Sequence, residues 1–194
     1  MALPFTPQQR DEIRARLLES ARRHAIDDGP QRTSMDTLTS EAGISKSSFY
    51  KFFDSKEALF LQVAMRWEQE ILACATEALH ASAGRSDKER ASAVVFTAFE
   101  CIHRLGIARF LREDVPYLSA FIPDENVRAH CLSSAHSIFD ALRAAHIRFT
   151  APDEIVLPVI ELMYLSIMHM NEVGDSFFPA LQTLVDCACA RLVA

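Results

Sequence analysis

The sequence predicts an all-α protein with two domains, an N-terminal three-helix domain of the helix-turn-helix type and a larger C-terminal helical domain. Its 194 residues include only 5 glycines and 8 prolines, and few segments alternate between polar and apolar residues. Apolar residues instead recur at helical spacing along most of the chain. Between residues 33 and 59, two short helical segments flank one glycine, and a third helix follows. We therefore predict domains at 1–55 and 56–194.

The first predicted helix has an apolar stripe at Ile13, Leu17, Ala21 and Ala25, which indicates one buried face. A second, shorter helix places Met35, Leu38 and Ala42 on one face. Gly43 follows as a residue that can end a helix with positive φ.

Three polar residues are predicted to begin helices. Thr33 can cap the second helix, with Asp36 as its partner in a capping box, and Ser45 can cap the third. Asp54 is expected to cap the long helix that follows, with Glu57 at its third position.

The third helix has one apolar and one polar face. Phe49, Phe52 and Phe53 are expected to point toward a core, which leaves Ser47, Tyr50 and Lys51 on the outside. Short hydroxyl side chains, a phenol and amines suit a helix in the major groove of DNA, because they allow close approach and can contact phosphates or base edges. The predicted DNA-binding residues are Thr33, Ser34, Ser45, Lys46, Ser47, Ser48, Tyr50, Lys51 and Lys56.

The same stretch resembles the TetR family of bacterial transcriptional regulators. The resemblance rests on the runs Ala42–Ser45 and Ser55–Glu57 together with Phe49, Tyr50, Phe53 and Leu59, and it extends over about residues 8–65. It implies an N-terminal DNA-binding domain and a C-terminal domain that binds an inducer and dimerises. The chain departs from the family at Ser47, where members often have Gly or Ala, so no base preference is implied.

Charge is unevenly distributed along the chain. The net charge is −6, yet residues 1–60 contain nine basic and nine acidic residues, so the acidic excess lies in the remainder. We expect strongly salt-dependent binding to double-stranded DNA with a palindromic operator, because phosphate contacts release counterions.

The remaining helices are predicted from apolar stripes and polar breaks. They are expected at about 56–79, 88–105, 107–112, from after Pro123 to 149, 153–172 and 177–192. The helix at 153–172 is apolar on nearly all sides, which indicates burial against both its own core and a second subunit. The predicted residues of this homodimer interface are Val156, Val159, Ile160, Met163, Ile167, Leu181, Leu184, Val185 and Ala188. A central helix of a monomer would give the same pattern.

Aromatic, Met and His residues concentrate in the middle of the chain, which favours a pocket for a small apolar or aromatic effector. Core packing is the alternative for each residue taken alone. His103 or His136 is expected to orient the effector. The predicted ligand-binding residues are Trp67, Phe96, Phe99, His103, Phe110, Tyr117, Phe121, His136, Phe139, Met163 and Tyr164.

Other classes of function have less support. The sequence has no phosphate-binding glycine loop, nucleophile elbow or HExxH pattern, so we expect no enzyme, no catalytic residue and no cofactor. The spacing of His130, Cys131 and His136 gives no pair of metal ligands, so no metal is expected. A redox switch at Cys187 or Cys189 is the less favoured alternative, as is a helical ligand-binding protein that does not bind DNA. Five cysteines without CxxC spacing and the lack of a secretory signal indicate a cytoplasmic protein.

Overall fold

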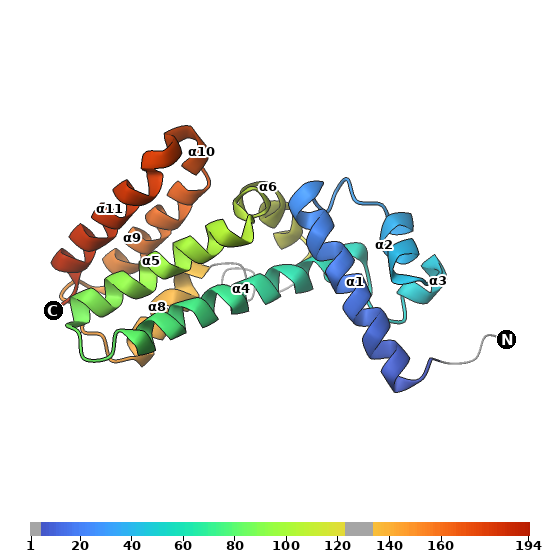
Figure 1. The fold of residues 1–194 in the computed structure, drawn as a ribbon, viewed down its shortest axis with the longest axis horizontal. Helices are drawn as coiled ribbons and strands as arrows, with labels where there is room; N and C mark the ends of the chain where they lie inside the picture. Colours follow the sequence, from blue (N-terminus) through green and yellow to red (C-terminus); the bar gives the residue numbers. More distant parts are fainter. Residues whose placement is uncertain (1–4, 123–133) are drawn as a thin grey trace. The chain divides into compact units, whose positions relative to one another are not determined.

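The computed structural model describes residues 5–122 and 134–194, which are helical almost throughout (Figure 1). The chain folds as two compact units, one from the described residues of Met1–Arg66 and Arg109–Arg128, the other from those of Trp67–Ala108 and Ala129–Ala194. The predicted all-α class is confirmed. The units divide within the helix α4 (Lys56–Ala81), whereas the predicted domain boundary lies just before that helix.

The first unit contains α1 (Pro7–Asp27), α2 (Met35–Ala42), α3 (Lys46–Phe49), the start of α4 and most of α6 (Ala108–Ser119). A capping box begins α1, in which Thr6 and Gln9 bond reciprocally. The predicted stripe of α1 is buried, with Ile13, Leu17, Ala21 and Ala25 at most 4% exposed. Against it packs α2, which carries the fully buried Leu38 and Ala42.

The predicted caps of α2 and α4 were wrong by one residue. Ser34 rather than Thr33 caps α2, because its hydroxyl accepts from the Thr37 amide while the Thr33 hydroxyl donates to the carbonyl of Gly29. Likewise Ser55 rather than Asp54 lies at the start of α4, where its hydroxyl accepts from the Ala58 amide at 3.0 Å. At each of these two helix starts, two adjacent residues could serve as the cap, and the structure uses the second of them.

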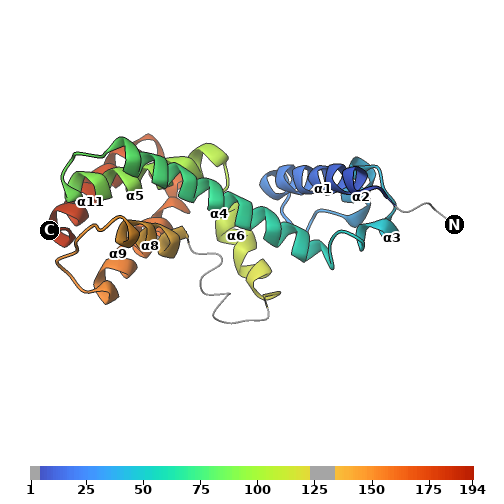
Figure 2. The ribbon, with the colours of Figure 1, turned by 90° about the horizontal axis from the view of Figure 1, so that it is seen from below.

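The second unit is a bundle of the later part of α4 with α5 (Asp87–Leu105), α8 (Ser134–Ala144), α9 (Asp153–Ile167) and α11 (Phe177–Leu192). Figures 1 and 2 show α5 beside α11, and α5 also contacts α9. Two short helical segments, α10 (Met170–Val173) and the 3-10 turn η1 (Gly174–Ser176), connect α9 to α11.

Most helices of the second unit follow the predicted ranges, and α11 has the predicted bounds. The predicted helix at 153–172 is divided, since α9 ends at Ile167 and α10 begins at Met170. The helix predicted to end at 149 stops earlier, at Ala144, because His146 adopts positive φ and the Ile147 amide bonds back to the Leu142 carbonyl. Its predicted start after Pro123 lies outside the described residues. In the first unit, α6 is longer than predicted and contains Pro116.

Within the described ranges, no single helix is both long and apolar enough to cross a membrane. One bent pair of helices, α5 and α6, passes the same test by length and composition only.

Candidate DNA-binding surface

The turn between α2 and α3 has the geometry of a helix-turn-helix. Gly43 ends α2 with φ of 70°, a left-handed conformation that is strained for residues with a side chain. Ser45 then caps α3: its hydroxyl accepts from the Ser48 amide and lies 3.0 Å from the hydroxyls of both Ser47 and Ser48. Three serines therefore form a hydroxyl cluster at the start of α3.

The two faces of α3 and the turn after it are separated as predicted. Phe49 is fully buried and Phe53 is 6% exposed, whereas Tyr50 is 62% exposed and Ser47 and Lys51 are also exposed. The rings of Phe49 and Tyr50 meet edge to face with centroids 5.6 Å apart. This buried ring supports the exposed phenol next to it.

Two arginines of α1 anchor the segment that follows α3, an arrangement that sequence reasoning missed. Arg10 donates to the carbonyl of Lys51 at 3.2 Å, and Arg14 donates to the carbonyl of Phe52 at 3.0 Å. The Arg14 guanidinium also lies over the Phe53 ring, 4.5 Å from its centroid. Because the partners are 38 or 41 residues apart, no local pattern indicates them.

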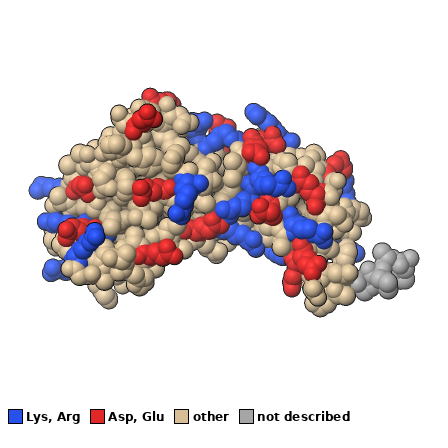
Figure 3. Space-filling view, viewed as in Figure 1, with Lys and Arg blue, Asp and Glu red and all other residues tan. Residues whose placement is uncertain are grey.

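The charged residues of this surface include acidic ones. The ammonium of Lys46 forms an ion pair with Asp36 at 2.8 Å, and both side chains are more than half exposed. Figure 3 shows basic and acidic side chains interspersed over the face that it displays. An exposed pair of this kind contributes little to stability, so a phosphate can take the place of Asp36 at little cost.

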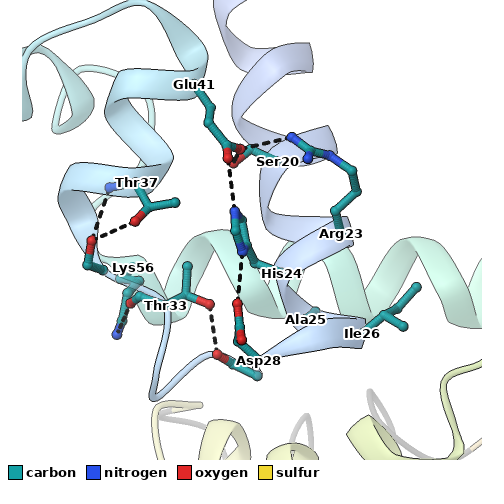
Figure 4. A network of polar contacts seen from close by, with 12 residues as sticks. Ser20, Arg23, His24, Ala25, Ile26, Asp28, Thr33, Thr37, Glu41 and Lys56 are labelled. Carbon is teal, nitrogen blue, oxygen red and sulfur yellow. Dashed lines mark hydrogen bonds and ion pairs between the residues drawn. The ribbon is translucent and has the colours of Figure 1, made fainter.

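Thr33 is buried and Lys56 is half-buried. Thr33 is 4% exposed, and its carbonyl accepts a hydrogen bond from the Lys56 ammonium at 3.0 Å (Figure 4). Both were predicted to contact DNA, but these side chains bond within the first unit. Ser34 is exposed, and its hydroxyl lies 2.8 Å from that of Thr37.

A polar network centred on Glu41 joins α1 to α2 (Figure 4). Ser20 and Arg23 donate to one carboxylate oxygen of Glu41 at 2.6 and 2.9 Å, while His24 lies 3.1 Å from the other and 3.2 Å from Asp28. Burial lowers the pKa of His24, but the hydrogen bonds and charges of Glu41 and Asp28 outweigh it, so that this pKa is raised overall. The Ser20 and His24 bonds lower the pKa of Glu41.

Within the first unit, α6 is bonded to α1 and α4. Arg109 donates to the carbonyls of Ala25 and Ile26 at 2.8 and 2.9 Å, where α1 ends. Asp114 is buried beside Arg109, and burial raises the pKa of its carboxyl group. Tyr117 donates to the carboxylate of Glu57 at 2.9 Å, so Glu57 serves this bond instead of the capping role predicted for it.

The predicted ligand-binding residues fall in both units. Phe110, Tyr117 and Phe121 belong to the first unit and the others to the second. Within the second, Trp67, Phe99, Phe139 and Tyr164 are buried and Phe96 is half-buried.

A cavity of about 560 Å³ that is open to solvent lies in the second unit, between the end of α4, the outer face of α5 and Phe178. Of the predicted ligand-binding residues, His103 alone lines it, with its ring 4.9 Å from that of Phe178. His136 instead lies 3.6 Å from Glu161. Phe178 and the polar wall that Glu77, Thr97 and Glu100 form were not among the predicted residues.

Most of the predicted dimerisation residues pack inside the second unit. Val156, Ile160, Ile167, Leu181 and Val185 are at most 5% exposed. Val159, Met163 and Ala188 are half-buried and line a small apolar void of about 30 Å³, whereas Leu184 is 57% exposed.

One side of the helix predicted at 153–172 is exposed to solvent in the single chain. Ile155, Leu162 and Leu165 on α9 are 52%, 66% and 51% exposed. Together with Leu184 they form an exposed apolar set. Of these four residues, only Leu184 was among the predicted dimerisation residues.

Residues 17–63 match the sequence profile of the bacterial regulatory proteins of the tetR family. Among proteins of curated function, none matches the chain. The match includes α2, α3 and the start of α4, on which the predicted resemblance rested.

Solved structures of bacterial transcription regulators have the same fold. A TetR family transcription regulator from Marinobacter aquaeolei VT8 superposes with a TM-score of 0.67 at 20% identity, over 97% of this chain and 99% of that one. The transcriptional regulator FadR from Bacillus subtilis, solved in complex with stearoyl-CoA, gives 0.64 at 12% identity over 91% and 97%. The ketosteroid regulator KstR2 of Mycobacterium tuberculosis gives 0.58 at 17% identity over 93% and 95%.

Proposed function

Because this chain carries the DNA-binding domain of the TetR family within the fold of its transcription regulators, we propose that it is a ligand-responsive repressor. It would act in the cytoplasm as a homodimer, and as a regulator rather than an enzyme. The observation that carries the proposal is the separation of faces at α3, where Phe49 is buried and Ser47, Tyr50 and Lys51 are exposed.

The exposed residues of α3 and of the positions on either side of it suit the major groove. The short side chains of Ser45 and Ser47 allow the helix to approach base edges, while Tyr50 and Lys51 can bond phosphate oxygens. Arg10 and Arg14 support this arrangement because they hold the backbone after α3. In place of Thr33 and Lys56, which bond internally, we propose Thr37 as an additional contact, since its hydroxyl lies beside the exposed Ser34.

A homodimer would bind a palindromic operator with half-sites about one helical turn apart. We propose that the exposed apolar residues of α9 and α11 meet their copies in the partner: Ile155, Leu162, Leu165 and Leu184. The predicted dimerisation residues that are buried in the monomer would pack beneath this face and hold its side chains in place. Large apolar side chains at this exposure are what a subunit interface covers.

The effector we propose is a small apolar or aromatic molecule oriented by His103 or His136. His103 has the better support, because it lines the 560 Å³ cavity beside Phe178. Binding would shift the population toward an arrangement with lower affinity for DNA. A differential affinity of about 1.4 kcal/mol is enough for tenfold release.

The test is to incubate the purified protein with fragmented genomic DNA from its source at physiological salt and to sequence the retained fragments. We expect enrichment of a palindrome. A protein with Tyr50→Phe and Lys51→Ala substitutions and an unchanged melting temperature is the control and should enrich none. If the unmodified protein, refolded after denaturation and dialysis to remove any bound effector, still enriches no sequence, the function is that of a helical ligand-binding protein instead.

A further inference from the structure

Two cysteines from different helices of the second unit lie in direct contact. The sulfur atoms of Cys74 in α4 and Cys101 in α5 are 2.8 Å apart, and both thiols are free. A disulfide has an S–S distance of about 2.05 Å, so bond formation would require the two atoms to approach by about 0.8 Å. Small movements of two side chains provide this.

A cation lies next to both sulfur atoms. Arg104 is one turn after Cys101 in α5, and its Nη2 is 3.1 Å from the sulfur of Cys74 and 3.5 Å from that of Cys101. A guanidinium at this distance can pair with a thiolate, which is the form of cysteine that attacks peroxides.

The two thiols differ in access. Cys74 is half-buried, whereas Cys101 is 2% exposed, and both line the 560 Å³ cavity together with Arg104. Burial and the adjacent Cys74 raise the pKa of the Cys101 thiol to about 11. A small molecule therefore reaches Cys74 more easily than Cys101. The Cys101 thiol stays protonated until it reacts.

We propose that Cys74 and Cys101 are an oxidation site at which a hydroperoxide converts the two thiols to a disulfide between α4 and α5. The Cys74 thiol gives up its proton, and its thiolate attacks the outer oxygen of the hydroperoxide and becomes a sulfenic acid. The O–O bond breaks, and the alkoxide that leaves takes up that proton to become an alcohol, or water from hydrogen peroxide. The Cys101 sulfur then attacks the sulfenic sulfur. The displaced hydroxide takes the Cys101 proton and leaves as water, so that two thiols lose two electrons to one peroxide bond.

This site differs from the redox alternative at the C-terminus. Cys187 is exposed and Cys189 is buried, and burial raises the pKa of the Cys189 thiol to about 11. Neither has a described cysteine or arginine at bonding distance, as Cys74 and Cys101 have. The proposal concerns the thiols alone and does not depend on DNA binding.

The test is peptide mapping after oxidation of the full-length protein. Reduced protein is treated with hydrogen peroxide up to a dose that oxidises the exposed Cys187, quenched with catalase, and alkylated with N-ethylmaleimide. We expect linked peptides containing Cys74 and Cys101, with a loss of about 2 Da relative to the two thiols. Cys187→Ser should give the same link.

Two further variants separate the steps. Cys101→Ser should yield no link and accumulate a sulfenic acid at Cys74, which dimedone traps. Arg104→Met should slow the loss of the Cys74 thiol several-fold, whereas Arg104→Lys, which keeps the charge, should slow it less. The proposal is wrong if Cys74 and Cys101 are both recovered as unoxidised, alkylated thiols at the peroxide dose that oxidises Cys187. It is also wrong if Cys74 links to another cysteine.

Discussion

The Lys56 ammonium donates a hydrogen bond to the Thr33 carbonyl at 3.0 Å, and so joins the first turn of α4 to the residue before the cap of α2. The two residues are 23 positions apart, and the helix-turn-helix lies between them. Lys56 therefore closes the segment that contains α2 and α3. In the free protein, its ammonium group holds the two ends of this segment together.

Lys56→Met should reduce the free energy of unfolding by about 1 kcal/mol, because a charge-assisted hydrogen bond is lost while the aliphatic packing stays. The salt dependence of DNA binding should be unchanged, since the ammonium bonds inside the protein. Urea unfolding and binding measured at several salt concentrations check both. A decrease of about one in the slope of log K against log salt would instead identify Lys56 as a phosphate contact.

Tyr50→Phe and Lys51→Ala should weaken operator binding while the melting temperature stays the same. Loss of one bond to a phosphate should weaken binding by about fivefold to tenfold in each variant, and Lys51→Ala should also lower the salt slope by about one. Lys88→Ala removes an exposed lysine of the second unit and is the matched control. Binding of both variants equal to that of Lys88→Ala would show that the recognition face is assigned incorrectly.

The stability of the N-terminal unit should depend on the protonation of His24. Its pKa in the folded protein is raised above 6.5, so its contribution is complete below pH 6.5 and is lost as the pH rises through the folded value. Glu41 behaves oppositely, because its pKa is lowered from 4.5: its contribution is present above that value and is lost as the pH falls through the lowered one.

His24→Gln should therefore remove the decrease in stability above pH 6.5. Urea unfolding midpoints of the wild type and the variant, measured across this range, test the prediction. His80→Gln removes an exposed histidine of α4 and should keep the wild-type profile. Parallel profiles for wild type and His24→Gln would contradict the prediction.

The sequence was sufficient for features that depend on neighbouring residues. The stripe of α1, the positive φ of Gly43, the Ser45 cap and the bounds of α11 all follow from local patterns. Features set by partners outside the local helix pattern could not be predicted. Thr33 and Ser34 are equally suited to cap α2, and the carbonyl of Gly29 decides between them by binding Thr33.

The same limit applies to the sites. The two faces of α3 follow from helical periodicity, but Arg10, Arg14 and Lys56 reveal their roles only through distant carbonyl groups. Periodicity could not separate the inner from the outer face of α9, because both are apolar. Packing decides, with Ile160 inside and Leu162 outside.

Leu162→Glu should raise the dissociation constant of the dimer at least tenfold, or about 1.4 kcal/mol, since it places a charge on the apolar face that we propose the partner covers. Sedimentation equilibrium measures this. Met65→Glu, at another exposed apolar residue, is the control and should leave the dimer unchanged. Equal association of both variants would rule out this face of α9.

Gly29→Ala should destabilise the protein more than Gly84→Ala does. Both glycines have positive φ, 85° and 91°, so each alanine carries a similar backbone cost of about 1 kcal/mol. At Gly84 an added Cβ meets no atom within 4 Å, but at Gly29 it would lie 2.8 Å from Oδ1 of the buried Asp114.

Asp114 cannot move away freely, because it is packed beside Arg109, which bonds the end of α1. We therefore expect Gly29→Ala to cost about 1–2 kcal/mol more than Gly84→Ala in urea unfolding, since the contact must be relieved by displacing α6 or the end of α1. In the double variant with Asp114→Ala, the extra cost should disappear, because the atom that the Cβ meets is gone. If the extra cost persists there, the backbone conformation of Gly29, and not the close approach of α6, explains why the position is a glycine.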